Sequence, residues 1–420
     1  MIPCISLALV AALPVRAEAL DLETAVSLAL EVHESPAIAL AEAEQAKAQV
    51  RAAWSRMLPT VALSGTYRRR AFEVKPSLGD GSTATIQAKN ALSAEASLET
   101  TLFDASAIPE LQAARLRSRA QTLSAEETAR SLAFETAEAF YAALAADRTL
   151  AAAERRLALA EATAENAQAR FAAGLVGSGE KNRTQLDQAE AAQVQAEATR
   201  AARLARLALG FLVGATPAGE LVAPKAPASA ANGAERPDVA AARLLMQAAE
   251  RATWTPWLSM VPSLALDASL RATNETGFQN RVFNWDIALT LTWVLYDGGA
   301  RYAQVDLRNA QAEAARLAAQ ALSRQAELEV ERAAAELQAS LLIAEQAQTR
   351  ARVAEENREE VEARFRQGLA SALEETDAAT AAFAASVGLE QARFEAAQAA
   401  LSVARAAGGW PTPRRESPKP

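Results

Sequence analysis

Histidine and cysteine, the side chains that most often act as catalytic bases, nucleophiles and metal ligands, each occur once in the 420 residues. A zinc site built from His and Cys needs three or four such ligands, and a disulfide needs two cysteines. A Ser-His-Asp triad would have only His33 as its base, and Pro36 nearby predicts a helix bend where His33 is a polar surface residue. We therefore expect no catalytic residue, no metal and no cofactor.

An acidic pair follows the last tight turn of the chain. Glu374 and Asp377 are three residues apart, so they share one face of a helix. Acidic side chains in a first turn complement the positive end of the helix dipole, and this role alone would account for both.

Two short segments place a leucine directly after a glycine, Gly174-Leu175-Val176 and Gly368-Leu369-Ala370. Each glycine ends a long stretch without glycine, and polar residues then restart a helix, which predicts a C-cap with positive φ and a reversal of direction. A leucine at such a turn has no core to enter. Because the same leucine recurs, we interpret it as a docking point for a partner; the alternative is a capping turn with a chance hydrophobe.

The composition indicates long, closely packed helices rather than a thick globular core. Half of the residues are hydrophobic but only 5% are aromatic, and about a quarter of all residues are alanine, well above its usual share. Alanine is the best helix former and allows close approach between helices. The net charge of −8, from 43 basic and 51 acidic residues, argues against nucleic acid as a partner.

The chain contains an internal repeat. Four short motifs recur in the same order, among them Arg170-Phe-Ala-Ala-Gly-Leu175 with Arg364-Phe-Arg-Gln-Gly-Leu369, and Leu102-Phe-Asp104 with Leu295-Tyr-Asp297. We predict a first structural repeat at 20–214 and a second at 237–408, joined by a surface linker at 215–236. The proline-rich residues 409–420 are predicted to be a disordered tail.

Each repeat is expected to run helix, strand, strand, very long helix, tight turn, long helix. The stretches 104–173 and 300–367 lack glycine, and each can form a helix of about 70 residues, or roughly 105 Å. Their apolar stripes are typical of helices with two neighbours in a curved wall. On these helices alone, a coiled-coil scaffold without a pore remains the alternative, and fractionation would separate the two because a scaffold is soluble.

Strands with one apolar and one polar face argue against the scaffold. Leu63, Gly65 and Tyr67 alternate with polar residues in the first repeat, as do Leu264, Leu266, Ala268 and Leu270, and then Ile287 to Leu295, in the second. Hairpins are expected at about 58–103 and 261–296. Four such strands are too few to close a membrane barrel, so a barrel would have to be shared between chains.

The first residues form a short apolar run followed by Val15-Arg16-Ala17, which resembles a signal-peptidase site. We therefore predict a signal peptide at 1–19 and export from the cytoplasm. No later apolar run reaches the roughly 18 residues of a membrane helix.

These motifs together resemble the TolC-like outer membrane efflux proteins. The resemblance rests on the repeat, on Leu58-Pro59-Thr60 before the first strand, on Leu295-Tyr-Asp-Gly-Gly-Ala-Arg301 after the last, and on the Arg-Phe-x-x-Gly-Leu turns. It implies a mainly α fold with a small β part: a homotrimer with a 12-stranded β-barrel in outer membrane lipid and an α-helical tunnel in the periplasm. It also implies a conduit for efflux or type I secretion that works with a periplasmic adaptor (membrane fusion protein) and an inner-membrane transporter.

The same resemblance implies roles for the turn residues. In the family, the helix–turn–helix tips dock the adaptor. The matching tip residues here are Gly174, Leu175, Val176, Gly368, Leu369 and Ala370. The family's closed periplasmic entrance carries two aspartates, which match Glu374 and Asp377. In the first repeat Glu180 matches Glu374, but Arg183 stands where a second acid would. Ala370 replaces an arginine that helps to close the entrance in the best-known member. The exported substrate cannot be read from the sequence.

Overall fold

The computed structural model describes residues 19–77, 79, 81, 83–224, 235–279 and 281–412. Residues 1–18 of the predicted signal peptide, 225–234 of the predicted linker and 413–420 of the predicted tail lie outside this part. The elements are α1 (Leu22–Val32), α2 (Glu34–Ser55), β1 (Thr60–Arg69), β2 (Asn90–Phe103), α3 (Ala107–Ala172), α4 (Ser178–Val213), α5 (Pro237–Ala252), α6 (Trp254–Leu258), β3 (Ser263–Thr273), β4 (Phe283–Thr292), α7 (Ala300–Arg366) and α8 (Ala372–Ala406).

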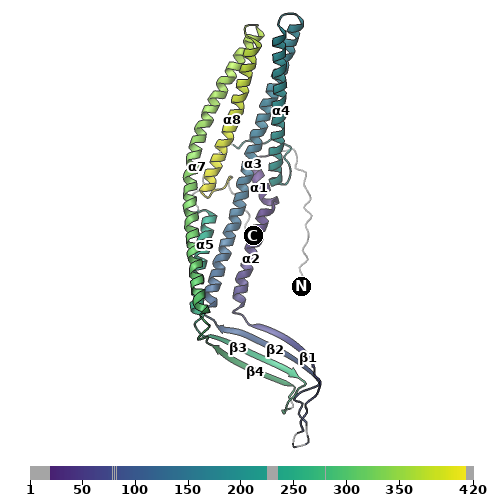
Figure 1. Cartoon of the computed structure of the whole chain (residues 1–420), viewed down its shortest axis with the longest axis vertical. Helices are drawn as coiled ribbons and strands as arrows, with labels where there is room; N and C mark the ends of the chain where they lie inside the picture. Colours follow the sequence, from purple (N-terminus) through teal and green to yellow (C-terminus); the bar gives the residue numbers. More distant parts are fainter. Residues whose placement is uncertain are drawn as a thin grey trace. The chain divides into compact units, whose positions relative to one another are not determined.

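The order of these elements repeats within the chain, as the sequence predicts (Figure 1). The first helix of each half is divided, at His33 in the first half and at Thr253 in the second. His33 Nδ1 accepts a hydrogen bond from the Ser35 backbone N–H at 3.2 Å, and its ring meets Phe211 edge-on at 5.7 Å. His33 thus sits at a helix break.

The four strands form one antiparallel sheet in the order β1-β2-β3-β4 (Figure 1). The register pairs Leu63 with Ala96 between β1 and β2, and Ala268 with Ile287 between β3 and β4. The central contact, between β2 and β3, joins the hairpin of the first repeat to that of the second.

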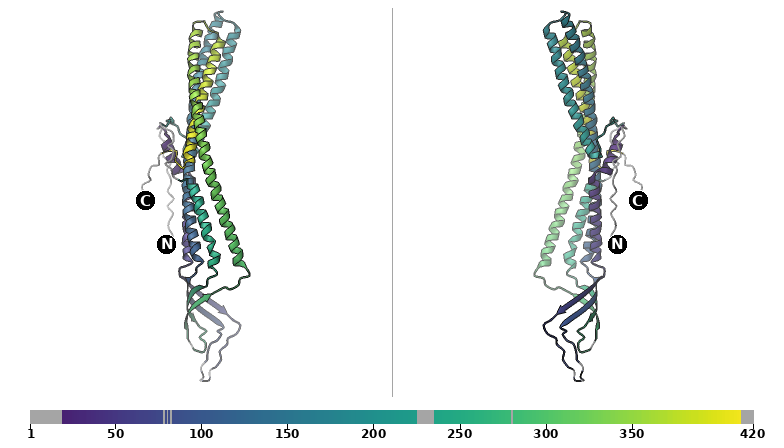
Figure 2. Two further views of the ribbon diagram at one scale, coloured as in Figure 1. Left: turned by 90° about the vertical axis from the view of Figure 1, so that its left-hand side faces the viewer. Right: turned by 90° about the vertical axis from the view of Figure 1, so that its right-hand side faces the viewer.

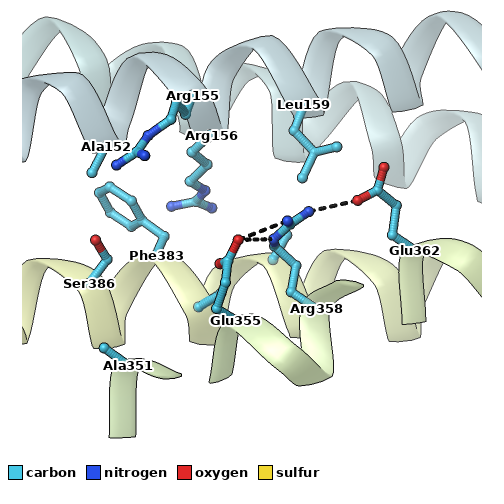
Figure 3. A pocket seen from close by; sticks show the side chains of 12 residues that line it. Ala152, Arg155, Arg156, Leu159, Ala351, Glu355, Arg358, Glu362, Phe383 and Ser386 are labelled. Atoms are coloured by element: carbon cyan, nitrogen blue, oxygen red, sulfur yellow. Dashed lines mark hydrogen bonds and ion pairs between the residues drawn. The ribbon is translucent and has the colours of Figure 1, made fainter. Parts of the chain in front are cut away.

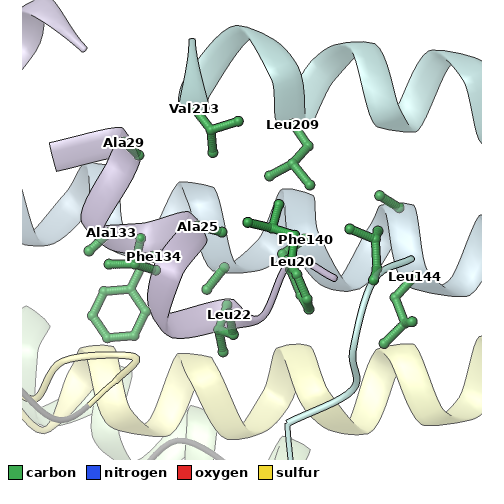
Figure 4. Close-up of a cluster of buried hydrophobic side chains, with 14 of the residues drawn as sticks. Leu20, Leu22, Ala25, Ala29, Ala133, Phe134, Phe140, Leu144, Leu209 and Val213 are labelled. Carbon is green, nitrogen blue, oxygen red and sulfur yellow. The ribbon is translucent and has the colours of Figure 1, made fainter. Parts of the chain in front are cut away.

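The described residues form two compact units, and each unit combines segments of both repeats. One unit contains the described parts of 1–39, 126–237 and 324–420, and the other contains 40–125 and 238–323. The main hydrophobic core lies in the first of these units. It gathers Phe134 and Phe140 of α3, Leu209 of α4 and Leu22 of α1 (Figure 4).

Described residues of the segments that were predicted as a surface linker and a disordered tail contact this core. Leu221 is buried in the same cluster, where its backbone bridges to Leu20, and Trp410 packs against the cluster. Arg206 fixes the intervening segment by donating hydrogen bonds to the carbonyl oxygens of Pro217 and Gly219. The sequence composition did not indicate these contacts because they depend on residues far away along the chain.

In the other unit, alanines bring neighbouring helices close together. Ala113 of α3 packs against Ala248 and Ala252 of α5, with Leu116 beside them. Figure 2 shows α5 running alongside the first part of α3 in both views. Small side chains at this contact let the two backbones approach each other closely.

The motif between the last strand and α7 is explained by its geometry. Gly298 and Gly299 both have positive φ, 71° and 89°, a conformation that favours glycine. The Asp297 carboxylate accepts hydrogen bonds from the backbone N–H groups of Gly299 and Arg301, and the Arg301 guanidinium also donates to it. Arg301 reaches back to the Val294 carbonyl oxygen at 2.6 Å, so the strand exit and the helix start are held as one piece.

Candidate functional site

One face of the sheet is apolar across all four strands. The register aligns Leu63 with Ala96, and Leu270 with both Ala96 and Trp285, so these side chains form a row on a single face. Leu63 is 82% exposed and Trp285 is 70% exposed. A large exposed apolar face marks an interaction surface.

The opposite face of the sheet is polar, and its charged residues are more often acidic than basic. Glu99 of β2 stands directly opposite Asp267 of β3, and the Ser269 hydroxyl donates a hydrogen bond to Asp286 at 2.6 Å. Glu95 is opposite Arg271, which gives one pair of opposite charges. The sheet therefore has one apolar face and one polar face.

The sheet also has two unsatisfied edges. Within the described chain β1 and β4 each pair on one side only. Each is ten residues long. Long edges with free N–H and C=O groups are a template for pairing with another chain.

Tryptophans lie at both junctions between helix and strand. Trp54 and Trp257 occupy equivalent places, each three residues before the methionine that precedes a strand, and both are about half exposed. Trp293 follows β4, and its indole N–H donates to the Met260 carbonyl oxygen at 3.1 Å. Tryptophan at such positions is typical of a membrane–water interface.

The two predicted turns have the same hydrogen-bond pattern. After α3, Gly174 N–H donates to the Phe171 carbonyl and Leu175 N–H to the Arg170 carbonyl, both at 2.9 Å. After α7, Gly368 and Leu369 make the corresponding bonds, at 3.0 and 2.9 Å. This is the Schellman arrangement, which places the glycine in a left-handed conformation.

Both glycines do have positive φ, 73° for Gly174 and 75° for Gly368. The leucines that follow point away from any core, since Leu175 is 74% exposed and Leu369 is 66% exposed. Val176 and Ala370, next in sequence, are half-buried. The turns therefore present one exposed leucine in each repeat.

Glu374 acts as a helix cap. Its carboxylate accepts hydrogen bonds from the Ser371 backbone N–H at 2.7 Å and from the Ser371 hydroxyl at 3.0 Å, while the Ser371 hydroxyl accepts from the Glu374 backbone N–H. These bonds to the Ser371 backbone and hydroxyl lower the pKa of Glu374. Glu374 is therefore charged at neutral pH and remains exposed at the start of α8.

Asp377 forms an ion pair with Arg183, the residue that stands where a second acid would be expected in the first repeat. Its Oδ1 lies 3.3 Å from Arg183 Nη2 of α4, and both side chains are largely exposed. Glu180, three residues before Arg183, is half-buried in the first turn of α4. The structure thus links α4 to α8 through an ion pair that the sequence alone did not reveal.

Glu375, which sequence reasoning missed, is buried beside these residues and only 5% exposed. The Thr163 hydroxyl of α3 donates a hydrogen bond to its carboxyl group at 2.9 Å. Burial raises the pKa of Glu375, although the bond from Thr163 acts in the opposite direction. In the sequence, the one indication of a buried acid here was that Glu375 directly follows Glu374 and so lies on the inner side of the helix.

A pocket of about 500 Å³ lies between α3, α7 and α8 (Figure 3). On its α3 side, Arg156 pairs with Asp187 of α4 at 3.3 Å and stacks over the Phe383 ring of α8 at 5.2 Å. On its α7 side, Arg358 lies between Glu355 and Glu362. Through its two contacts, Arg156 of α3 connects α3 to α4 and α8.

None of the helices among the described residues is both sufficiently long and sufficiently apolar to span a bilayer. Across the same residues, no three His, Cys, Asp or Glu side chains are grouped as a metal site would require.

The fold is similar to those of solved bacterial membrane proteins. A membrane protein from Pseudomonas aeruginosa matches with a TM-score of 0.80 and 22% identity, over 94% of this chain and 91% of that one. The Campylobacter jejuni CmeC outer membrane channel matches with a TM-score of 0.79 and 20% identity, over 92% of this chain and 85% of that one. The open state of the Neisseria gonorrhoeae MtrE outer membrane channel matches with a TM-score of 0.78 and 21% identity, over 92% of this chain and 89% of that one. No curated protein matches the sequence.

These likenesses confirm the predicted fold class, which is mainly α with long helices, a small four-stranded part and a two-fold internal repeat. The sequence itself matches the family model for the outer membrane efflux protein over residues 25–215 and 232–409. This match covers most of both repeats and confirms the resemblance drawn from the motifs. The chain belongs to the outer membrane efflux protein family.

Proposed function

We propose that three copies of this chain form the exit duct of a tripartite efflux or type I secretion system. In this duct, four strands per chain give a 12-stranded barrel in the outer membrane of a Gram-negative bacterium, and the long helices extend into the periplasm. The observation that carries the proposal is the sheet with one exposed apolar face and two unpaired edges.

Barrel closure accounts for both features of the sheet. In lipid every backbone N–H and C=O group must be satisfied, and about eight strands are the minimum for a closed barrel. A fourth strand of one chain that pairs with the first strand of the next removes the open edges of β1 and β4. The apolar face then contacts lipid, and the acidic face lines the water-filled interior.

The tips are the proposed docking points for the periplasmic adaptor that connects the duct to an inner-membrane transporter. The exposed leucines, Leu175 and Leu369, stand on turns with identical hydrogen bonds, so both repeats offer the same contact. Their glycines and the following Val176 and Ala370 complete these turns. Transport through a duct is a conducting role and needs no catalytic residue.

The proposed periplasmic gate consists of Glu374, Asp377 and Glu180. Three chains would bring three copies of each acid to one entrance, where the negative charge would favour cations. The capping box fixes Glu374, and the ion pair with Arg183 fixes Asp377, so both carboxylates are held near the turns. Arg183 reduces the net negative charge that an acidic ring would otherwise have.

The assembly can be tested by membrane fractionation without detergent, followed by light scattering of the protein in mild detergent. We expect the protein in the outer membrane fraction and a trimer in solution. A soluble protein would favour the pore-free periplasmic scaffold. A monodisperse monomer that keeps its full β content would contradict the shared barrel.

A further inference from the structure

A basic groove lies between α3 and α5, in the unit that contains the strands. Its volume is about 520 Å³, and its lining includes Gln112, Arg115, Arg119, Gln247, Arg251 and Trp254. The floor is apolar, since Leu116 lines it next to the alanine contact between the two helices. All three arginines are exposed.

The positive charge of this groove is only partly compensated, because three arginines and a single acid line it. Arg115 and Arg119 are four residues apart on one helix, where like charges repel. In the part of the chain that the structure describes, neither they nor Arg251 form a hydrogen bond or ion pair. The only acid in the lining is Glu250, whose charge also acts on Arg316 of α7.

The equivalent region of the second repeat lacks this feature. Arg308 follows Asp297 by eleven residues, as Arg115 follows Asp104, but Arg308 lies 3.9 Å from the carboxylate of Glu110. The position equivalent to Arg119 is occupied by an alanine. The excess of positive charge is therefore particular to this groove and is not shared by the second repeat.

The polar groups of the groove match a phosphate. Guanidinium groups bind phosphate oxygens through paired N–H donors. Gln112, Gln247 and Trp254, whose side chains also carry N–H donors, line the same groove. A single carboxylate among so many donors leaves the groove selective for an anion.

The groove is also close to the strands. Arg115 is eight residues into α3, or about 12 Å along the helix from its first turn, which follows β2 directly. The polar layer of a bilayer is roughly 5–8 Å thick on each side, and long arginine side chains reach toward it. Trp254, which lines the groove, begins α6, the short helix that precedes β3, and tryptophan is typical of a membrane–water interface.

We propose that this groove binds the phosphate headgroup of an anionic lipid from the periplasmic leaflet. Basic pockets between helices at a membrane surface commonly bind such headgroups. The proposal rests on the outer membrane location given above. Lipid held there would fix the height of the helices against the bilayer.

The test uses the purified full-length protein in detergent and measures the binding of fluorescently labelled phosphatidylglycerol by anisotropy. The variant R115Q/R119Q should bind about thirtyfold more weakly, which corresponds to roughly 1 kcal/mol for each arginine near an anionic surface. The matched control is R117Q, which removes an exposed arginine of the same helix that does not line the groove. The affinity of R117Q for the lipid should stay within about twofold of that of the unchanged protein.

Four results would overturn the proposal. Equal affinity of R115Q/R119Q and the unchanged protein would exclude the groove, as would an equal loss in R117Q. Displacement of the lipid by inorganic phosphate at equal concentration would assign the groove to free phosphate. If R115Q/R119Q changed the ion selectivity of the channel but left lipid binding intact, the groove would lie in the conducting path. Fractionation of the unchanged protein tests the membrane location separately, so failure of either idea can be recognised.

Discussion

Breaking the ion pair between Arg183 and Asp377 should make the proposed gate open more often. The two side chains are 46% and 67% exposed, so the pair contributes about 0.2–1 kcal/mol, as exposed pairs do. In the proposed trimer, three such pairs would act on one entrance and together contribute about 0.6–3 kcal/mol. The variant R183A should therefore raise the ratio of open to closed channel by about three- to 150-fold in single-channel recordings.

Salt and charge reversal provide the controls for this experiment. Because exposed charges are screened, the difference between R183A and the unchanged protein should shrink in about 1 M salt. The reversed pair R183D/D377R should restore closure, whereas R352A, which breaks an exposed Arg352–Glu356 pair within α7, should have no effect. The reasoning is refuted if R183A leaves the open fraction unchanged at low salt, or if R183D/D377R opens the channel as much as R183A does.

Three other variants test the remaining assignments. Replacing Leu175 and Leu369 by Ser should leave the thermal stability of the trimer nearly unchanged, because both are exposed, but should reduce adaptor binding; misassembly would show that they are core residues. The variant E374Q/D377N should lose cation selectivity and block by divalent cations from the periplasmic side, and unchanged recordings would leave these acids as helix caps. Burial raises the pKa of Glu375, so the folded state favours its protonated form and stability falls as pH rises through the usual range for Glu. E375Q should remove this fall in thermal unfolding measured against pH, and an identical pH profile would contradict the burial.

The elements of the fold could be predicted because their signals are local. Alternation of apolar and polar residues predicts a two-faced strand wherever it occurs, and the register then aligned the apolar residues on one face. The turns were equally readable, since Gly174 and Gly368 each end a glycine-free stretch and only glycine adopts their φ readily. A second copy of each motif made both predictions stronger.

The contacts that hold these elements together could not be predicted in the same way. Glu375 is one of three acids in a four-residue segment, and only the packing of α8 against α3 buries it. Arg183 was seen as a departure from the acidic pattern, but its partner on α8 is 194 residues away. The same holds for Arg70 and Glu275, which join the loop after β1 to the loop after β3. Such contacts depend on the three-dimensional arrangement, which a pattern in one sequence does not contain.

The sheet with its exposed apolar face and free edges has a consequence for biogenesis. Before it joins the proposed trimer, a single copy would expose ten-residue edges on β1 and β4 together with side chains such as Leu63 and Trp285. Such a surface favours aggregation in water, because strand edges pair with any available chain. Insertion and assembly therefore have to keep pace with synthesis. Overproduction should yield aggregated protein instead of a reserve of soluble single copies.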